Sequence, residues 1–230
     1  MNDPYRLRRW VAGASLIAWP VLHFVGFITG PGGSEHTPEL FRAEATRVQV
    51  SGLALHWSVM AIVPVVLALG HLLRARRPVF ADIAVALGLI GAVSGASLLV
   101  GDFYDLALAH LVPDGQAVAV MDQAFSYPAM VYGFLLPGFL VHIGLLMLII
   151  GLAVRRMIGW WVPVLVVAGL ALPFALPEAS VAVHSLGGTL IFAALAPLGV
   201  RILRMRPHEW TPMSPAAPQP VAERAPAPVA

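Results

Sequence analysis

The chain has 230 residues, of which 59% are hydrophobic and only 11% are charged, with a formal net charge of +2 at pH 7. A soluble domain carries about 25% charged residues, so this composition excludes an ordinary soluble globular protein. The absence of cysteine excludes disulfides, thiol nucleophiles and thiolate metal sites. The pI of about 9.5 does not indicate nucleic-acid binding, because the basic residues are all arginine and form small clusters beside apolar runs.

Apolar runs dominate the chain, and each is close to the length of about 20 residues that a helix needs to cross a bilayer. They cover about residues 10–30, 50–73, 80–100, 129–154, 158–176 and 179–203. The runs are too long for strands and do not alternate in polarity. The sequence therefore predicts an all-α, polytopic six-helix membrane bundle over residues 1–206. A disordered cytoplasmic tail rich in Pro and Ala is predicted for 207–230.

The arginines predict the orientation of the bundle. Clusters lie before the first run, between the second and third, between the fourth and fifth, and after the sixth: Arg6, Arg8, Arg9, Arg74, Arg76, Arg77, Arg155, Arg156, Arg201, Arg204 and Arg206. All of them fall on one side of the membrane if there are six spans. The positive-inside rule then places both termini in the cytoplasm. Arginine without lysine, with abundant Ala, Gly, Val and Pro, suggests a GC-rich bacterial genome, and hence the bacterial inner membrane.

Two loops on the opposite side carry signals of local structure. Thr37-Pro38 resembles a helix start, with Thr as the cap and Pro in the first helical position, so a short amphipathic helix is expected before the second run. In the loop after the third run, Pro113-Asp114-Gly115 predicts a turn flanked by helical segments.

Ionisable residues inside spans are costly and are usually placed for a reason. His23, His56 and His184 fall in the outer third of three predicted helices, and Asp102 lies at the outer end of the third. These four residues form the candidate catalytic site. The residues expected to surround it are Asp105, Glu178, Tyr104, Trp57 and His142, the last of these near the midplane.

Small residues share helix faces with these ionisable groups, as in the stripe Ser180, His184 and Gly188. Because small residues mark close helix approach, the ionisable groups are expected to face the bundle interior. Gly91 and Gly95 form a helix-packing pair. Prolines inside the runs should kink the helices: Pro64, Pro137, Pro163, Pro173 and Pro197.

Three interpretations of the histidines stay open. They can stabilise helix packing by bonding to carbonyls, serines or carboxylates. They can form an acid–base or ligand-binding cavity, in which a carboxylate such as Asp102 orients His56 or His184. They can also ligate a haem or a divalent metal, although no close ligand spacing such as His-x-x-x-His occurs.

Two segments, Arg9-Trp10-Val11-Ala12-Gly13 and Leu55-His56-Trp57 with the apolar run up to Arg74, resemble small bacterial multi-span membrane proteins of unknown function. The resemblance covers about the first 100 residues and implies a compact helix bundle without a particular activity.

The preferred hypothesis is a membrane protein whose outward-facing His/Asp site binds or transforms a small lipophilic molecule by acid–base chemistry. The alternatives are a non-enzymatic accessory or assembly protein, a single-haem or metal-binding redox protein, and a small transporter. The expected partners are the lipid bilayer and the lipophilic molecule, with no nucleic acid.

Overall fold

The computed structural model describes residues 5–31, 37–176 and 179–210, all of them in helices or the short connections between helices. The elements, in chain order, are α1 (Arg6–Thr29), α2 (Pro38–Ala43), α3 (Ala45–Arg74), α4 (Pro78–Leu98), α5 (Gly101–Leu111), α6 (Asp114–Ser126), α7 (Pro128–Met130), the π-helix η1 (Val131–Leu135), α8 (Leu136–Gly138), α9 (Leu140–Val154), α10 (Trp161–Ala175), α11 (Val181–Arg204) and α12 (Pro207–Trp210). The predicted all-α class is confirmed.

By helix length and hydropathy, the chain is a multi-pass membrane protein. Within the described residues, 5 helices are long and apolar enough to cross a membrane: Arg6–Thr29, Ala45–Arg74, Pro78–Leu111, Pro128–Val154 and Val181–Arg204. The fifth predicted run corresponds to α10, which has only 15 residues. At 1.5 Å per residue α10 is about 22 Å long, which is less than the hydrocarbon thickness of about 30 Å. The count of six spans therefore stays a prediction.

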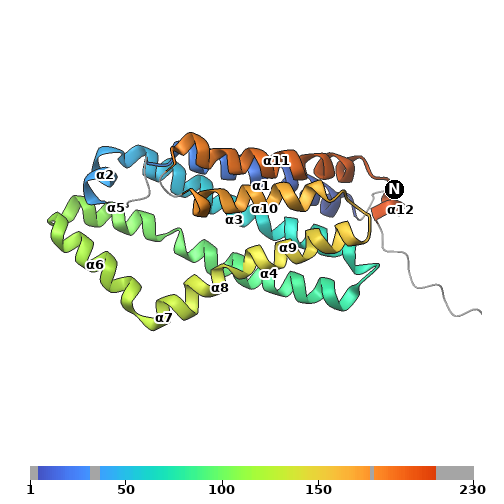
Figure 1. Cartoon of the computed structure of the whole chain (residues 1–230), viewed down its shortest axis with the longest axis horizontal. Coiled ribbons are helices and arrows are strands. Elements are labelled where there is room, and N and C mark those ends of the chain that lie inside the picture. The colour runs from blue at the N-terminus through green and yellow to red at the C-terminus, as the bar shows by residue number, and fades with distance from the viewer. Residues whose placement is uncertain (1–4, 32–36, 177–178, 211–230) are drawn as a thin grey trace, which may run out of the picture.

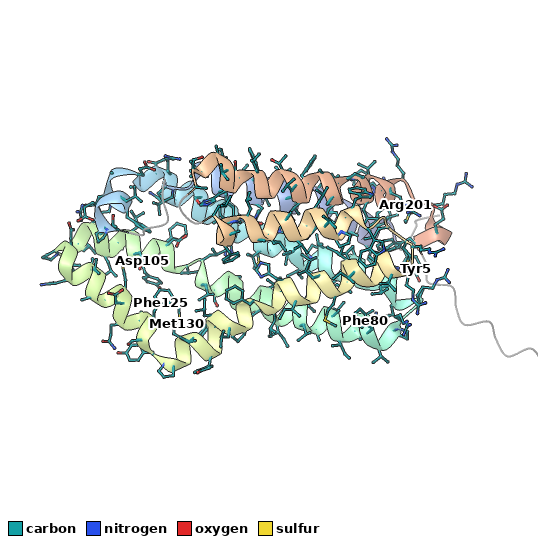
Figure 2. All side chains as sticks on the ribbon, in the orientation of Figure 1. Tyr5, Phe80, Asp105, Phe125, Met130 and Arg201 are labelled. Atoms are coloured by element: carbon teal, nitrogen blue, oxygen red, sulfur yellow. The ribbon has the colours of Figure 1, made fainter. Side chains whose placement is uncertain are left out.

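The long helices lie lengthwise beside one another, and the arginine-bearing ends of α1, α3, α9 and α11 lie together at the end where the N-terminus and α12 are found (Figure 1). Tyr5, Phe80 and Arg201 mark this arginine end, whereas Asp105, Phe125 and Met130 lie toward the other end (Figure 2). The arrangement agrees with the alternation of arginine clusters in the sequence.

Small residues let the long helices approach closely, as expected for helices in a membrane. A Cβ added at Gly91 would overlap the backbone of Val141 in α9, and one added at Gly13 would lie 2.8 Å from the carbonyl oxygen of Gly199 in α11. A Cβ added at Gly95 would have no atom within 4 Å. Both members of the predicted packing pair face another helix, since a Cβ added at Gly138 of α8 would lie 3.6 Å from the Gly95 backbone, but only Gly91 lacks room for a side chain.

A small cap covers the end of the bundle opposite the arginines. It is formed by α2, α5 and α6, and its apolar centre consists of Phe41, Val48, Leu106 and Ala109. The Thr37 hydroxyl accepts a bond from the Leu40 amide at 3.4 Å, which confirms the predicted helix start. Helical segments flank Pro113 as predicted, but the break is shorter than expected, because Asp114 and Gly115 already belong to α6.

An ion pair ties the cap together. Arg42 donates to both carboxylate oxygens of Asp114, at 2.5 and 2.8 Å, and to the Ala109 carbonyl at 2.6 Å. The hydrogen bonds from the Arg42 guanidinium lower the pKa of Asp114, and the same contact raises the pKa of Arg42. One arginine thus links α2 to both helices of the α5–α6 hairpin.

The fourth predicted run is not one regular helix. It passes through α7, η1 and α8 and is interrupted at Phe139 before α9 begins. Pro137 lies at this interruption, and its lack of an N–H group removes one helical hydrogen bond. The irregularity agrees with the kink expected there, and the π-helical turn was not foreseen.

The segment predicted to be a tail begins with α12, whose Trp210 is only 4% exposed. The remainder of that segment, 211–230, lies outside the described residues.

Candidate functional site

Two of the histidines in the long helices make hydrogen bonds to backbone carbonyls. His184 Nε2 lies 2.7 Å from the Leu176 carbonyl oxygen, and His71 Nε2 lies 2.6 Å from the Trp210 carbonyl oxygen. A histidine that bonds a carbonyl near a helix end stabilises packing and needs no ligand. In both His71 and His184, the Nε2 atom therefore already has a hydrogen-bond partner within the protein.

His23 in α1 and His142 in α9 differ from these two. The Nε2 atom of His23 and the Nδ1 atom of His142 are buried and have no hydrogen-bond partner in the described part of the chain. The Phe139 carbonyl interacts with the His142 ring but does not complete a hydrogen bond to Nδ1. A buried polar atom without a partner costs about 1–3 kcal/mol, so two of them on one site need an explanation.

Both rings line one cavity of about 350 Å³ between α1, α3, α4, α9 and α10, and they are close enough to interact electrostatically. The rest of the lining is almost entirely apolar: Trp19, Phe27, Leu55, Ser58, Val59, Ile62, Gly95, Leu98, Leu99, Leu135, Gly138, Phe139, Val141, Leu170 and Phe174. The Ser58 hydroxyl already donates to the Trp19 carbonyl at 3.5 Å. The cavity is thus an apolar chamber with two imidazoles in its wall, within the size range of small-molecule sites.

The depth of the cavity follows from helix geometry. His23 lies about 25 Å along α1 from Arg6, and His142 lies about 20 Å along α9 from Arg155. His23 is therefore nearer to the cap than to the arginine end, whereas His142 lies near the middle of the run that begins at Pro128 and ends at Val154.

The cavity reaches the outer surface of the bundle beside α10. Two lining residues, Phe139 and Phe174, are 42% and 68% exposed, and their ring centroids are 6.3 Å apart. Leu135 of η1 and Gly138 of α8 line the same side. π-Helical turns occur frequently at functional sites, and here the turn adjoins the mouth of the cavity.

A second chamber of about 250 Å³ adjoins the first on the side of the cap and contains Asp102 and His184. The two chambers share Phe27, Leu55 and Leu99 as lining residues. The Phe27 ring contacts His23 edge-on at a centroid distance of 4.8 Å and lies 6.3 Å from His184. Phe27 therefore stands between the two histidines.

The structure brings only some of the predicted site residues together. His23 lies in the first chamber, and Asp102 and His184 lie in the second. His56 lines neither chamber, and its ring packs 6.3 Å from the ring of Trp57.

The residues expected to surround the site are spread more widely. Trp57 and Tyr104 are 57% and 69% exposed, and neither these two nor Asp105 lines either chamber. Glu178 lies outside the described residues.

His142 was expected only to surround the site, whereas in the structure its ring lines the same cavity as the ring of His23. His142 follows closely on the irregular segment that contains Pro137-Gly138, and this dipeptide is the feature of the sequence that marks the segment. No group of three or more His, Asp or Glu residues that could hold a metal ion occurs within the described ranges. Comparison of the chain with protein-family models, with curated proteins and with solved structures finds no match.

Proposed function

We propose that this membrane protein binds a small lipophilic molecule with one hydrogen-bonding group in the cavity between His23 and His142. The observation that carries the proposal is the pair of buried ring nitrogens without partners, both on rings that line one apolar cavity. A ligand with an apolar body and a single polar group would satisfy both the wall and the imidazoles.

A hydroxyl or an enol is the polar group that suits this pair best. A neutral imidazole has one donor nitrogen and one acceptor nitrogen. A hydroxyl donates and accepts, so it can bond whichever nitrogen each ring presents. Two neutral imidazoles on one hydroxyl can also accept its proton and return it, since each ring has an acceptor nitrogen. The proposed chemistry is therefore acid–base chemistry at the polar end of the ligand.

The neighbouring chamber supports such a proton transfer. Asp102 and His184 lie there, separated from the first cavity by Phe27, Leu55 and Leu99. A carboxylate and an imidazole on the side of the cap could carry protons between the buried histidines and the aqueous phase. The ligand itself would enter sideways from the lipid between Phe139 and Phe174, since both rings are exposed at the mouth.

We also propose that all six predicted runs span the membrane, with the arginine end in the cytoplasm of a bacterium. The clustering of the arginine-bearing helix ends supports this orientation. A periplasmic reporter fused after Pro113 should be active and one fused after Arg76 should be silent. The opposite pattern would reverse the orientation.

Ligand binding can be tested with bromodecanol and bromodecane, two probes that differ in one hydroxyl. Bromine quenches tryptophan fluorescence on contact, and Trp19 lines the cavity. Trp19 quenching is measured as the difference between the wild type and the Trp19→Phe variant. Bromodecanol should bind about tenfold more tightly than bromodecane, as expected when a buried polar atom gains a partner.

Two variants of the same chain provide the controls. His23→Phe should abolish the preference for the alcohol, whereas His71→Phe, which lies outside this cavity, should keep it. Equal quenching by both probes in the wild type would contradict the proposal.

The second candidate is an accessory protein whose polar residues only hold helices together. Contacts between α3 and α1 favour it, since the buried Ser51 hydroxyl donates to the Gly26 carbonyl at 2.8 Å. In that case the removal of His23 should weaken the fold and change no binding.

A further inference from the structure

A third cavity lies at the arginine end of the bundle and has no part in the histidine site. Its volume is about 390 Å³, and α1, α3 and α12 form its walls. Its polar lining residues include Arg8, His71 and Arg74, and the apolar ones include Val11, Pro64 and Leu67.

The two charged side chains that line this cavity, Arg8 and Arg74, are both cationic and lie at one end of it. Arg74 is engaged with Asp82 at 2.5 Å. Arg8 belongs to none of the ion pairs found in the described part of the chain, and its guanidinium carbon stands 6.0 Å from the ring centroid of Tyr5. A cation that stacks on an aromatic ring in the wall of a cavity is positioned to receive an anion.

The remainder of the cavity is an apolar groove on the outer surface of the bundle. Leu7, Val11 and Leu67 line it and are 74%, 43% and 49% exposed. Along α3 the groove extends from Pro64 to Arg74, a length of about 15 Å. It runs from the arginine end toward the interior of the membrane, and Trp210, bonded through its carbonyl to His71, closes one side.

We propose that this groove holds one anionic phospholipid from the leaflet on the arginine side. Its phosphate would bond to Arg8, and one acyl chain would lie along Val11 and Leu67. Basic pockets between membrane helices are recognised sites for anionic headgroups. The charge complementarity at one end and the exposed apolar groove at the other both fit an amphiphile with an anionic head. The proposal is independent of the histidine cavity.

The test uses the full-length protein in mild detergent, with retained lipid counted by native mass spectrometry. The probes are dioleoyl phosphatidylglycerol, which is anionic, and dioleoyl phosphatidylcholine, which is zwitterionic. The wild type should retain phosphatidylglycerol in preference. Arg8→Gln should weaken that binding about fivefold, the contribution of one arginine near an anionic surface. Arg76→Gln removes the same charge from the same end outside the cavity and should change binding less than twofold.

A second pair of variants tests the groove itself. Val11→Trp should fill the groove and displace the lipid, whereas Val79→Trp, at an exposed position of α4 outside the cavity, should not. The proposal is overturned if Arg8→Gln and Arg76→Gln weaken binding equally, since that result indicates general surface attraction. It is also overturned if both lipids bind equally well, or if Val11→Trp retains phosphatidylglycerol as the wild type does.

Discussion

Replacing His23 by phenylalanine should make the protein more stable. In the ligand-free protein the buried Nε2 atom of His23 has no partner in the described part of the chain, which costs about 1–3 kcal/mol. Phenylalanine keeps an aromatic ring in the apolar wall beside Phe27 and removes the unsatisfied atom. The loss of any bond made by the other ring nitrogen would cost about 0.6 kcal/mol, the average for polar contacts between membrane helices. The expected net gain in the free energy of unfolding is therefore about 0.4–2.4 kcal/mol.

The assay is reversible unfolding in mixed micelles with increasing sodium dodecyl sulfate, followed by tryptophan fluorescence. His71→Phe is the matched control, because it leaves the Trp210 carbonyl without its partner and should lower the free energy of unfolding by about 1–3 kcal/mol. If a variant is more stable than the wild type but no longer binds the ligand, the wild-type residue serves binding and lowers the stability of the fold. A loss of 1 kcal/mol or more in His23→Phe, similar to that in His71→Phe, would refute the reasoning and favour a purely structural histidine.

Further predictions concern packing and the cap. Gly91→Ala should lower the thermal stability in detergent, because its Cβ would overlap the Val141 backbone, whereas Gly95→Ala, with no atom within 4 Å, should not; equal melting temperatures would contradict the close packing. Because the pKa of Asp114 is lowered in the folded protein, its pairing with Arg42 should stabilise the cap above pH of about 4 and fail as the pH falls further. Amide-exchange protection in α2 and α6 should show this loss, and Asp114→Asn should show it already at neutral pH. Unchanged protection in that variant would refute the role of the pair.

The fold follows from the sequence to the extent that local patterns control it. Apolar length predicts the long helices, Thr37-Pro38 predicts the start of α2, and Pro113 predicts the break between α5 and α6. These features depend on neighbouring residues alone. The π-helical turn over Val131–Leu135 leaves the apolar pattern of the run unchanged, and for that reason the pattern did not reveal it.

The candidate site was harder to predict because depth along a helix does not specify which side chains meet. His23, His56 and His184 have similar depths, yet the rotation of each helix about its axis directs them to different surroundings. His142 lies near the middle of its run, as the sequence predicts, but residue counting along the helix does not show that its ring meets His23. The sequence also does not show that His184 bonds the Leu176 carbonyl while His23 Nε2 lacks a partner in the described ranges.

The most direct test of the ligand site is nitrogen NMR of the protein labelled only at its histidines, with signals assigned by single His→Phe variants. Addition of decanol should shift the Nε2 signal of His23 and the Nδ1 signal of His142 toward hydrogen-bonded values. The signals of His71 and His184, which already bond carbonyls, should stay in place. If decanol leaves His23 and His142 unchanged, or shifts all four histidines alike, the cavity does not bind the ligand's polar group as proposed.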